Sequence, residues 1–284
     1  MKRTGHGLIA TTARSLAPFR LYRPESVADA VDSLARCPGA TLLAGGTDVA
    51  GQINAGLQPH AVVELRRVRQ LEDIHVTPDG LSLGAAVTHD RGARDPSVAA
   101  AIPGLAAAWR QIATVRIRNR ATVGGNLMAR KSRYEMSVML MALRARLHFA
   151  GPAGACDIAA EALWTDAAQS DSLLTHVVLP LPPGTVFGYD RSLRPTVTLA
   201  VALHRDGTAA TGHAAIATEW LSPCLLPLPP MRDLRDARQD AQTIAAMALA
   251  QLPGDFADVM TPHWYLARVG KVLLARTLRE IAND

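Results

Sequence analysis

The sequence predicts an α+β protein in two parts, and three patterns lead to this expectation. Between residues 19 and 65, short apolar runs typical of strands alternate with a helical stripe of apolar residues. Residues 74–85 form a hairpin pattern around Pro78-Asp79-Gly80, whose residues are typical of a tight turn. After residue 185, strand-like runs are followed by two helical runs, which indicates a second, smaller unit.

The first expected elements are a strand, a capped helix and a second strand. Residues 19–22 are expected to form the first strand, which Pro24 ends. Ser26 is placed to cap the helix that follows, and Asp29 stands at the third helical position for a capping box. Residues 41–43 then form a strand that leads into a glycine loop. The apolar stripe of the helix consists of Val27, Ala30, Val31 and Leu34.

The rest of the first part is predicted from short patterns. Residues 115–118 alternate apolar and basic side chains, which is the period of a strand. Residues 135–144 carry Met at helical spacing, so we expect a buried helix there. The other elements expected in this part are a helical turn at 48–56, a strand at 61–65, a helix at 103–113 and a strand at 145–150.

The second part is expected to contain an antiparallel strand pair and two helices. Arg205-Asp206-Gly207 is expected to join the strands. Thr261 is expected to cap the last helix, with Pro262 in its first turn. The expected elements are strands at 196–204 and 208–220 and helices at 234–252 and 261–282.

Two glycine loops are the centre of the chemistry that the sequence predicts. They are Leu42-Leu43-Ala44-Gly45-Gly46-Thr47-Asp48-Val49 and Ala121-Thr122-Val123-Gly124-Gly125-Asn126-Leu127. Paired glycines let backbone amides close on a phosphate without Cβ atoms in the way, so two such loops predict a two-sided phosphate clamp. Neither loop is the G-x-G-x-x-G fingerprint or the phosphate loop ending in Gly-Lys-Ser/Thr, so a different nucleotide fold is expected.

Composition argues against several classes of function. The 30 basic and 25 acidic residues give a net charge of +5, which is too mild an excess for us to expect a nucleic-acid partner. Cys37, Cys156 and Cys224 are widely separated, so we expect reduced thiols of a cytoplasmic protein and no zinc or iron–sulfur site. The histidines are scattered and form no H-E-x-x-H motif, so no metal site is expected.

The segment 96–134 contains no acidic residue, and its charges are clustered around the second glycine loop. One interpretation is a solvated basic face. Two others are the rim of an anion-binding cleft and a docking surface for an acidic partner. The basic residues are Arg110, Arg116, Arg118, Arg120, Arg130, Lys131 and Arg133.

No run approaches the ~20 apolar residues that a membrane span needs. Residues 1–17 contain Lys2, Arg3 and Arg14 but neither an acidic residue nor the apolar region of a secretory signal. Their composition resembles a transit segment, but we expect these residues to be a flexible arm or a partner-binding extension instead.

Four segments carry a resemblance to a known family. They are Tyr22-Arg23-Pro24, Ala44-Gly45-Gly46-Thr47-Asp48, Gly84-Ala85-Ala86-Val87-Thr88 and the run from Arg116 through Leu127. The chain resembles the FAD-binding middle subunit of molybdenum-containing hydroxylases, the family of xanthine dehydrogenase, carbon monoxide dehydrogenase and bacterial aldehyde oxidoreductases. The resemblance covers residues 19–280 in order.

The resemblance implies a fold and a division of the chain. It implies a two-part FAD-binding domain similar to the vanillyl-alcohol oxidase (PCMH) type, followed by a small α+β domain of the CO dehydrogenase flavoprotein type. The implied boundaries are an N-terminal extension at 1–15, the FAD-binding domain at 16–185 and the C-terminal domain at 186–284.

The resemblance also implies which residues bind FAD. Glu135 stands where the family usually has an Asp that holds the adenosine moiety, and Asp190 falls near a position where some relatives have a lysine close to the flavin. Ile112 and Leu174 would be apolar contacts of the ring systems. The residues of the two loops implied to line the pyrophosphate, ribitol and flavin are Leu42, Leu43, Ala44, Gly45, Gly46, Thr47, Asp48, Val49, Thr122, Val123, Gly124, Gly125 and Asn126.

The function implied by the resemblance is electron transfer within a heterotrimer. A small partner with [2Fe–2S] clusters would deliver electrons to FAD, a large molybdopterin partner would hydroxylate the substrate, and an unidentified acceptor would take the electrons. No catalytic side chain is expected in this chain, because the flavin carries the chemistry. Non-covalent FAD is expected, because neither glycine loop contains His, Tyr or Cys.

Two alternatives to this function remain. One is a self-contained FAD-dependent reductase of the same fold, similar to the enolpyruvyl-sugar reductases. The other is a scaffold subunit that has lost FAD.

Overall fold

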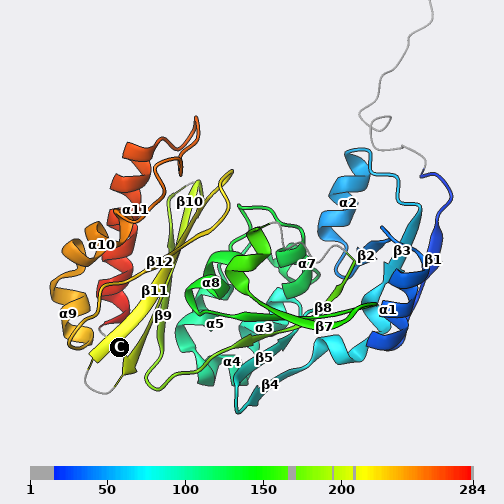
Figure 1. Ribbon diagram of the computed structural model, residues 1–284, viewed down its shortest axis with the longest axis horizontal. Helices are drawn as coiled ribbons and strands as arrows, with labels where there is room; N and C mark the ends of the chain where they lie inside the picture. The colour runs from blue at the N-terminus through cyan, green and yellow to red at the C-terminus, as the bar shows by residue number, and fades with distance from the viewer. Residues whose placement is uncertain (1–15, 166–170, 194, 207–208, 283–284) are drawn as a thin grey trace, which may run out of the picture.

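The computed structural model describes residues 16–165, 171–193, 195–206 and 209–282. Its strands form three sheets that follow one another along the chain, from the N-terminal part on the right of Figure 1 to the C-terminal part on the left. The first sheet is parallel and the other two are antiparallel, so the expected α+β class is confirmed. The expected extension at 1–15 and the turn residue Gly207 lie outside the described residues.

The first sheet has the strand order β1-β3-β2. Its strands are β1 (Arg20–Tyr22), β2 (Thr41–Leu43) and β3 (Ala61–Glu64), close to their predicted positions. The helix between the first two strands begins as expected, because the Ser26 side chain accepts a hydrogen bond from the backbone N–H of Asp29. The helices of this part are α1 (Val27–Arg36), α2 (Thr47–Asn54) and the 3₁₀ helices η1 (Leu65–Arg67) and η2 (Arg69–Glu72).

The second sheet has five antiparallel strands in the order β4-β5-β8-β6-β7. The predicted hairpin at 74–85 is present, with Ile74 opposite Leu83. The last strand of the order was not predicted from the sequence, because its side chains lie at or near the surface and give no apolar signal. The strands are β4 (Ile74–Thr77), β5 (Gly80–Gly84), β6 (Arg146–Gly151), β7 (Gly154–Ala159) and β8 (Leu173–Leu179).

Short helices lie between the strands of the second sheet. The prediction of a strand at 115–118 is wrong, because these residues form a single helical turn. The hydroxyl of Thr114 accepts a hydrogen bond from the backbone N–H of Ile117 at the start of this turn. The helix predicted at 103–113 ends at Trp109, before Ala113 adopts a φ of +49°. The helices are α3 (His89–Arg94), α4 (Pro96–Ala101), α5 (Pro103–Trp109), α6 (Val115–Arg118), α7 (Val123–Met128), α8 (Met136–Ala142) and the 3₁₀ helix η3 (Ala160–Trp164).

The third sheet is antiparallel in the order β12-β11-β10-β9 and is covered on both faces (Figure 1). Helix α11 packs on one face, whereas α5 and α8 of the central part contact the other. Alternate residues of β10 therefore enter two cores, with Leu199 and Val201 in one and Ala200 and Ala202 in the other. The strands are β9 (Val186–Arg191), β10 (Val197–Asp206), β11 (Ala209–Thr218) and β12 (Cys224–Pro227).

The C-terminal helices differ from the prediction in two places. The single helix expected at 234–252 is divided at Asp240, whose backbone leaves the helical region. Thr261 does not cap the last helix, because that helix begins one residue later than expected, with Pro262 at its N-cap position. The helices are α9 (Leu234–Gln239), α10 (Ala241–Leu249) and α11 (His263–Ile281). None of the helices in the described ranges is both long enough and apolar enough to cross a membrane.

The two glycine loops meet backbone to backbone. A Cβ atom added to Gly45 would lie 1.8 Å from the carbonyl oxygen of Arg120, and one added to Gly124 would lie 2.8 Å from Cβ of Ala85. The guanidinium of Arg120 donates from Nε to the carbonyl oxygen of Gly45 over 3.3 Å. The first sheet and the central helices are thus joined at a contact that has no room for a side chain.

We predict that Gly45→Ala lowers the free energy of unfolding by at least about 2 kcal/mol, because the added methyl group meets fixed backbone. Gly51→Ala is the matched control, since Gly51 lies inside α2 with no heavy atom within 4 Å of an added Cβ. Alanine there should raise stability by about 0.5–1 kcal/mol. Urea unfolding of both variants makes the comparison, and equal stability would show that the loops do not need this contact.

Candidate functional site

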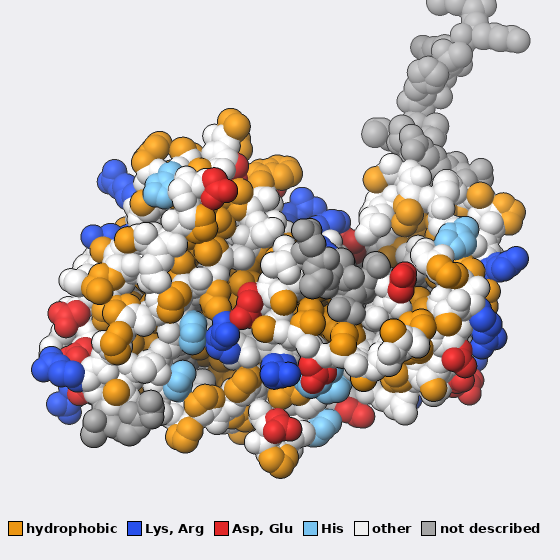
Figure 2. Space-filling view, in the orientation of Figure 1, with side chains coloured by type: hydrophobic (Ala, Val, Ile, Leu, Met, Phe, Trp, Pro, Cys, Tyr) orange, Lys and Arg blue, Asp and Glu red, His pale blue; other side chains and the backbone are white. Residues whose placement is uncertain are grey.

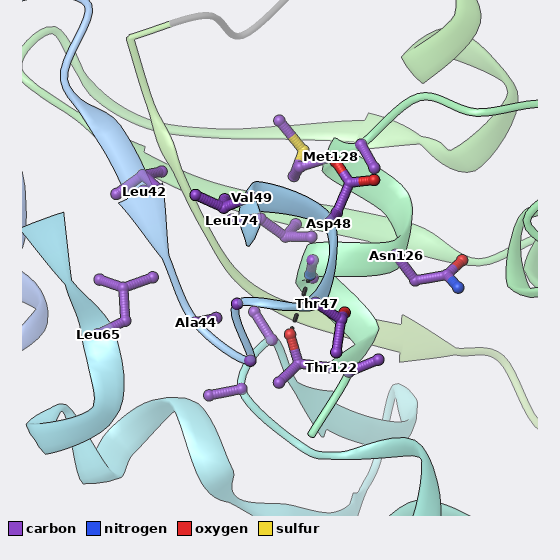
Figure 3. A pocket seen from close by; sticks show the side chains of 18 of the residues that line it. Leu42, Ala44, Thr47, Asp48, Val49, Leu65, Thr122, Asn126, Met128 and Leu174 are labelled. Atoms are coloured by element: carbon purple, nitrogen blue, oxygen red, sulfur yellow. Dashed lines mark hydrogen bonds between the residues drawn. The ribbon is translucent and has the colours of Figure 1, made fainter. Parts of the chain in front are cut away.

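A pocket of about 540 Å³ lies where the first sheet meets the central helices. Figure 3 shows Ala44, Thr47 and Asp48 from the β2–α2 segment on one side, and Thr122 and Asn126 from the start of α7 on the other. Pockets for cofactors and other small molecules usually measure about 300–1,000 Å³, so the space is large enough for such a ligand.

Nearly all the residues implied as FAD contacts line this one pocket, although they come from distant parts of the chain. Leu43 and Val123 do not. Leu43 follows Leu42 in a strand, and successive side chains of a strand point to opposite sides. Val123 is fully buried in the core of the central part. The lining residues among those predicted are Leu42, Ala44, Gly45, Gly46, Thr47, Asp48, Val49, Ile112, Thr122, Gly124, Gly125, Asn126, Glu135 and Leu174.

The start of α2 presents unused hydrogen-bond donors to the pocket. Gly46 is the N-cap residue, with a φ of +78°, and no side chain caps the helix. Among the hydrogen bonds of the described residues, none is donated by the backbone amides of Thr47, Asp48 or Val49. Unpaired amides and the helix dipole together make this eight-residue helix a favourable place for an anion.

The start of α7 differs, because protein acceptors already occupy its amides. The N–H of Gly124 donates to the carbonyl of Ala85 over 2.8 Å, and the N–H of Gly125 donates to the Thr122 hydroxyl over 3.0 Å. The sequence implied these two glycines as phosphate donors. In the structure their amides fix the loop, whereas the absence of side chains keeps the pocket open beside them.

Asp48 joins the two walls of the pocket through Tyr134 and Lys131, and Gln52 of its own helix also contacts it. Its carboxylate accepts hydrogen bonds from Tyr134 over 2.8 Å, from Gln52 over 2.6 Å and from Lys131. Burial alone would raise the pKa of Asp48, but these hydrogen bonds, that of Lys131 foremost, hold the pKa below its ordinary value. Lys131 therefore pairs with a residue that lines the pocket and is not a freely solvated charge, although Lys131 itself is not among the lining residues.

Three other basic residues of the segment 96–134 donate to backbone carbonyls, and two of them, Arg118 and Arg120, do so at residues that line the pocket. The bonds are Arg110 Nε to Ala93, Arg118 Nη1 to Ile112 and Ala113, and Arg120 Nε to Gly45. On the face shown in Figure 2, basic and acidic side chains are interspersed rather than gathered by sign. Much of the basic cluster thus stabilises the loops of the pocket.

Glu135 connects the pocket to the C-terminal sheet. Its carboxylate accepts hydrogen bonds from Arg191 over 2.8 Å and from the hydroxyl of Tyr189 over 3.3 Å. Burial raises the pKa of Glu135, and the charge of Arg191 opposes that effect without cancelling it. Asp190 instead pairs with Arg276 on α11 and is not among the pocket residues, because it points to the other side of β9.

The pocket residues that were not predicted from the sequence include Tyr134 and His89. His89 is fully buried, and its Nδ1 accepts a hydrogen bond from Trp109 Nε1 over 2.9 Å. Burial and the nearby charge of Arg118 lower the pKa of His89 to about 4, so its ring is neutral at pH 7. Its place directly after the family-like segment ending in Thr88 was the signal available in the sequence. No cluster of His, Cys, Asp or Glu within the described ranges could hold a metal ion.

The part of the chain that forms the pocket matches a known protein family. The family described as FAD binding domain in molybdopterin dehydrogenase matches residues 17–182. The chain belongs to this family. The matched region contains both glycine loops and the whole lining of the pocket, so the resemblance read from the sequence is confirmed.

Curated relatives of this FAD-binding family agree with the match. The chain is 31% identical over 184 residues to the nicotine 6-hydroxylase medium subunit of Paenarthrobacter nicotinovorans, which covers 63% of this chain and 65% of that protein. It is 34% identical over 135 residues to a putative xanthine dehydrogenase FAD-binding subunit of Escherichia coli K12, which covers 47% of this chain and 46% of that protein. The matched stretches thus span less than two thirds of these relatives.

A solved structure shows the same fold over nearly the whole chain. A chain of the reconstituted CO dehydrogenase from Oligotropha carboxidovorans superposes with a TM-score of 0.81 at 24% identity, covering 95% of this chain and 99% of that chain. The likeness extends beyond the FAD-binding region to the C-terminal sheet and helices. The predicted combination of an FAD-binding part and a CO dehydrogenase flavoprotein-like C-terminal part is therefore confirmed as a fold.

We predict that Asp48→Asn lowers stability at pH 7 by no more than about 1 kcal/mol, since Asp48 and Lys131 both keep some contact with solvent. The folded state lowers the pKa of Asp48, so its stabilising effect is present above the ordinary value of 3.8 and is lost as pH falls through the lowered pKa. The difference between wild type and variant should therefore shrink as pH falls below 3.8 and disappear once Asp48 is protonated in the folded state as well.

Urea unfolding between about pH 7 and pH 2.5 measures this difference. Asp32→Asn is the control, because the Asp32 side chain is 68% exposed and faces Arg36 only at 4.0 Å. A difference for Asp48→Asn that is constant across the range would show that the ionised carboxylate is not what stabilises the pocket wall.

Proposed function

We propose that this chain is the FAD-binding electron-transfer subunit of a heterotrimeric molybdenum hydroxylase of the aldehyde, xanthine or CO dehydrogenase type. The observation that carries the proposal is the meeting of the two glycine loops at one pocket, where the start of α2 offers unpaired amides to an anion. The family match over residues 17–182 supports FAD as the occupant.

The residues present suit the parts of FAD. The pyrophosphate, which is anionic, would bind at the start of α2 over Gly45 and Gly46, where no Cβ atom intervenes. Thr122 and Asn126 would contact the phosphates or the ribityl chain from the other wall, and Glu135 would accept from the adenosine moiety. Ile112 and Leu174, both almost fully buried, offer apolar surface to the ring systems.

Bound FAD would supply the redox chemistry, by carrying electrons from the [2Fe–2S] clusters of a small partner subunit to an external acceptor. The polypeptide would bind and orient the cofactor and exclude water from its buried parts. Substrate hydroxylation would take place on molybdopterin in a large partner subunit. The names of the relatives, which are medium or FAD-binding subunits, support this division of work.

Two further expectations remain proposals. We propose that the FAD-binding domain comprises residues 16–185 and the C-terminal domain residues 186–284, a division supported by the end of the family match at 182. We also propose that the protein acts in the cytoplasm, which the three cysteines support because all are free thiols.

The absorbance spectrum of the purified chain tests the proposal. A bound flavin gives bands near about 450 nm, and a chain that shows none and cannot be reconstituted with FAD would be the scaffold subunit named above as an alternative. Reduction of bound flavin by a nicotinamide cofactor, with turnover of a small substrate in the absence of partner subunits, would instead identify a self-contained reductase. The proposal expects flavin bands and no such turnover.

We predict that Gly125→Val abolishes retention of FAD and leaves the chain folded. A Cβ at this position meets only the Thr122 hydroxyl, at 3.0 Å, so a branched side chain would extend into the pocket rather than into the core. Gly51→Val is the control, because Gly51 does not line the pocket. Flavin content and melting temperature are measured together. Full flavin content in Gly125→Val would remove this loop from the site, and unfolding would show that the glycine is structural.

We predict that denaturation releases all the flavin from the polypeptide, because FAD is bound without a covalent link. His89 and Tyr134 are the pocket residues of a type that could form such a link. Both nitrogens of His89 have partners, and the hydroxyl of Tyr134 donates to Asp48. Yellow colour that stays with the chain after acid precipitation would contradict this expectation.

A further inference from the structure

Asp48 sets a negative charge beside the free amides at the start of α2. It lies in the first turn of this helix and lines the pocket (Figure 3). Its own backbone N–H is one of those that donate no hydrogen bond within the described part of the chain. Four covalent bonds separate that nitrogen from the carboxylate oxygens, so the two are at most about 5 Å apart. An anion held by these amides would therefore meet a carboxylate at close range.

The charge of Asp48 is balanced by Lys131. The ammonium of Lys131 donates to Oδ1 of Asp48, and the hydroxyl of Tyr134 donates to the same oxygen over 2.8 Å. The Asp48 side chain is 14% exposed and that of Lys131 is 35% exposed, so solvent screens this pair less than a fully exposed one. Asp48 in turn raises the pKa of Lys131, so both groups are charged at pH 7. The pair as a whole is therefore neutral.

Arg120 is a second cation at the same place. Its Nε donates to the carbonyl oxygen of Gly45 over 3.3 Å, next to the N-cap residue Gly46. While Lys131 matches the charge of Asp48, the positive charge of Arg120 remains in excess and adds to the helix dipole. Without Lys131, the carboxylate would offset the charge of Arg120, and the start of α2 would attract an anion less strongly.

We propose that Lys131 is a positioning residue for the anionic pyrophosphate of the cofactor, which acts by neutralising the carboxylate of Asp48 and does not touch the ligand itself. This inference rests on the proposed FAD site. Asp48 lines the pocket and Lys131 does not, so the effect of Lys131 on a ligand passes through Asp48. The ion pair thus lets one residue offer its backbone N–H to an anion without its own side chain repelling that anion.

Three variants separate this role from a direct contact and from a structural link. Lys131→Met removes the ammonium group and keeps the length of the side chain. Asp48→Asn removes the charge and keeps an oxygen that can accept from Tyr134. The third variant combines both changes. FAD is titrated into the deflavinated full-length chain at low and high salt, and melting temperatures of the same samples show that each variant is folded.

We expect Lys131→Met to weaken FAD binding by about tenfold or more at low salt, because the carboxylate of Asp48 is then unmatched. This loss should shrink as salt rises, since ions screen the repulsion. Asp48→Asn should bind FAD at least as tightly as wild type, and the double variant should return to within about threefold of wild type. Lys271→Met makes the same change on α11, away from the pocket lining, and should leave affinity intact.

Three patterns of affinity would overturn the proposal. A double variant as weak as Lys131→Met, beside an Asp48→Asn variant of normal affinity, would show that Lys131 contacts the phosphates directly. Weak binding by both single variants would show that the ion pair is a structural link between the two walls. Equal affinities in all the proteins would show that the pair does not affect the ligand.

Inorganic pyrophosphate keeps this inference apart from the proposed function. Wild-type protein that binds no FAD would overturn the proposed function, and in that case calorimetric titration with inorganic pyrophosphate tests the anion site alone. The same ranking of the wild type and the three variants would support the neutralising role of Lys131. Equal affinities, or no binding of pyrophosphate by the wild type, would overturn it.

Discussion

The backbone contact between Gly45 and Arg120 fixes the geometry of the whole pocket. A Cβ atom added to Gly45 would lie only 1.8 Å from the carbonyl oxygen of Arg120. The two segments can therefore come this close only because Gly45 has no side chain. The same approach brings the guanidinium of Arg120 to the carbonyl of Gly45 and brings Lys131 and Tyr134 to Asp48. A wider separation would break these bonds together, so the pocket depends on this single close contact.

The two loops look alike in sequence but have different tasks. The first begins a helix whose N-cap is a glycine without a capping side chain, so the amides of its first turn remain available to a ligand. The second loop begins a helix capped by Thr122. Its backbone amides donate hydrogen bonds to the carbonyl oxygens of Ala85 and Val87 and to the hydroxyl of Thr122. Anion binding by backbone therefore belongs to the first loop, and the second contributes shape and the side chains of Thr122 and Asn126.

The sequence predicted the strands of the first sheet, the hairpin at 74–85 and the pair of long strands in the C-terminal sheet, where local patterns decide the structure, but it did not predict β7, β8, β9 or β12. It was wrong for residues 115–118, because an alternation only four residues long suits a strand and a helical turn equally, and no neighbouring strand is available there. It could not distinguish free from occupied amides, since the acceptor of Gly124 is Ala85, which comes from β5 and its following turn. His89 was missed for a related reason, because its two partners lie on α5 and α7 and only the fold brings them together.

Four consecutive residues of β9 connect the pocket to the C-terminal helix. Helix α11 packs so closely on Gly188 that a Cβ atom added to this glycine would lie 2.5 Å from a side-chain atom of Thr277. Asp190 forms an ion pair with Arg276 of the same helix. Tyr189 and Arg191 point to the other face of the strand and donate hydrogen bonds to Glu135. Glu135 is buried, so its charged form depends on the guanidinium that β9 supplies. A shift of β9 along α11 would change the charge at the edge of the pocket. Within the described ranges the C-terminal part supplies none of the lining residues, but it holds the lining residue Glu135, so its position and the electrostatics of the ligand site are physically coupled.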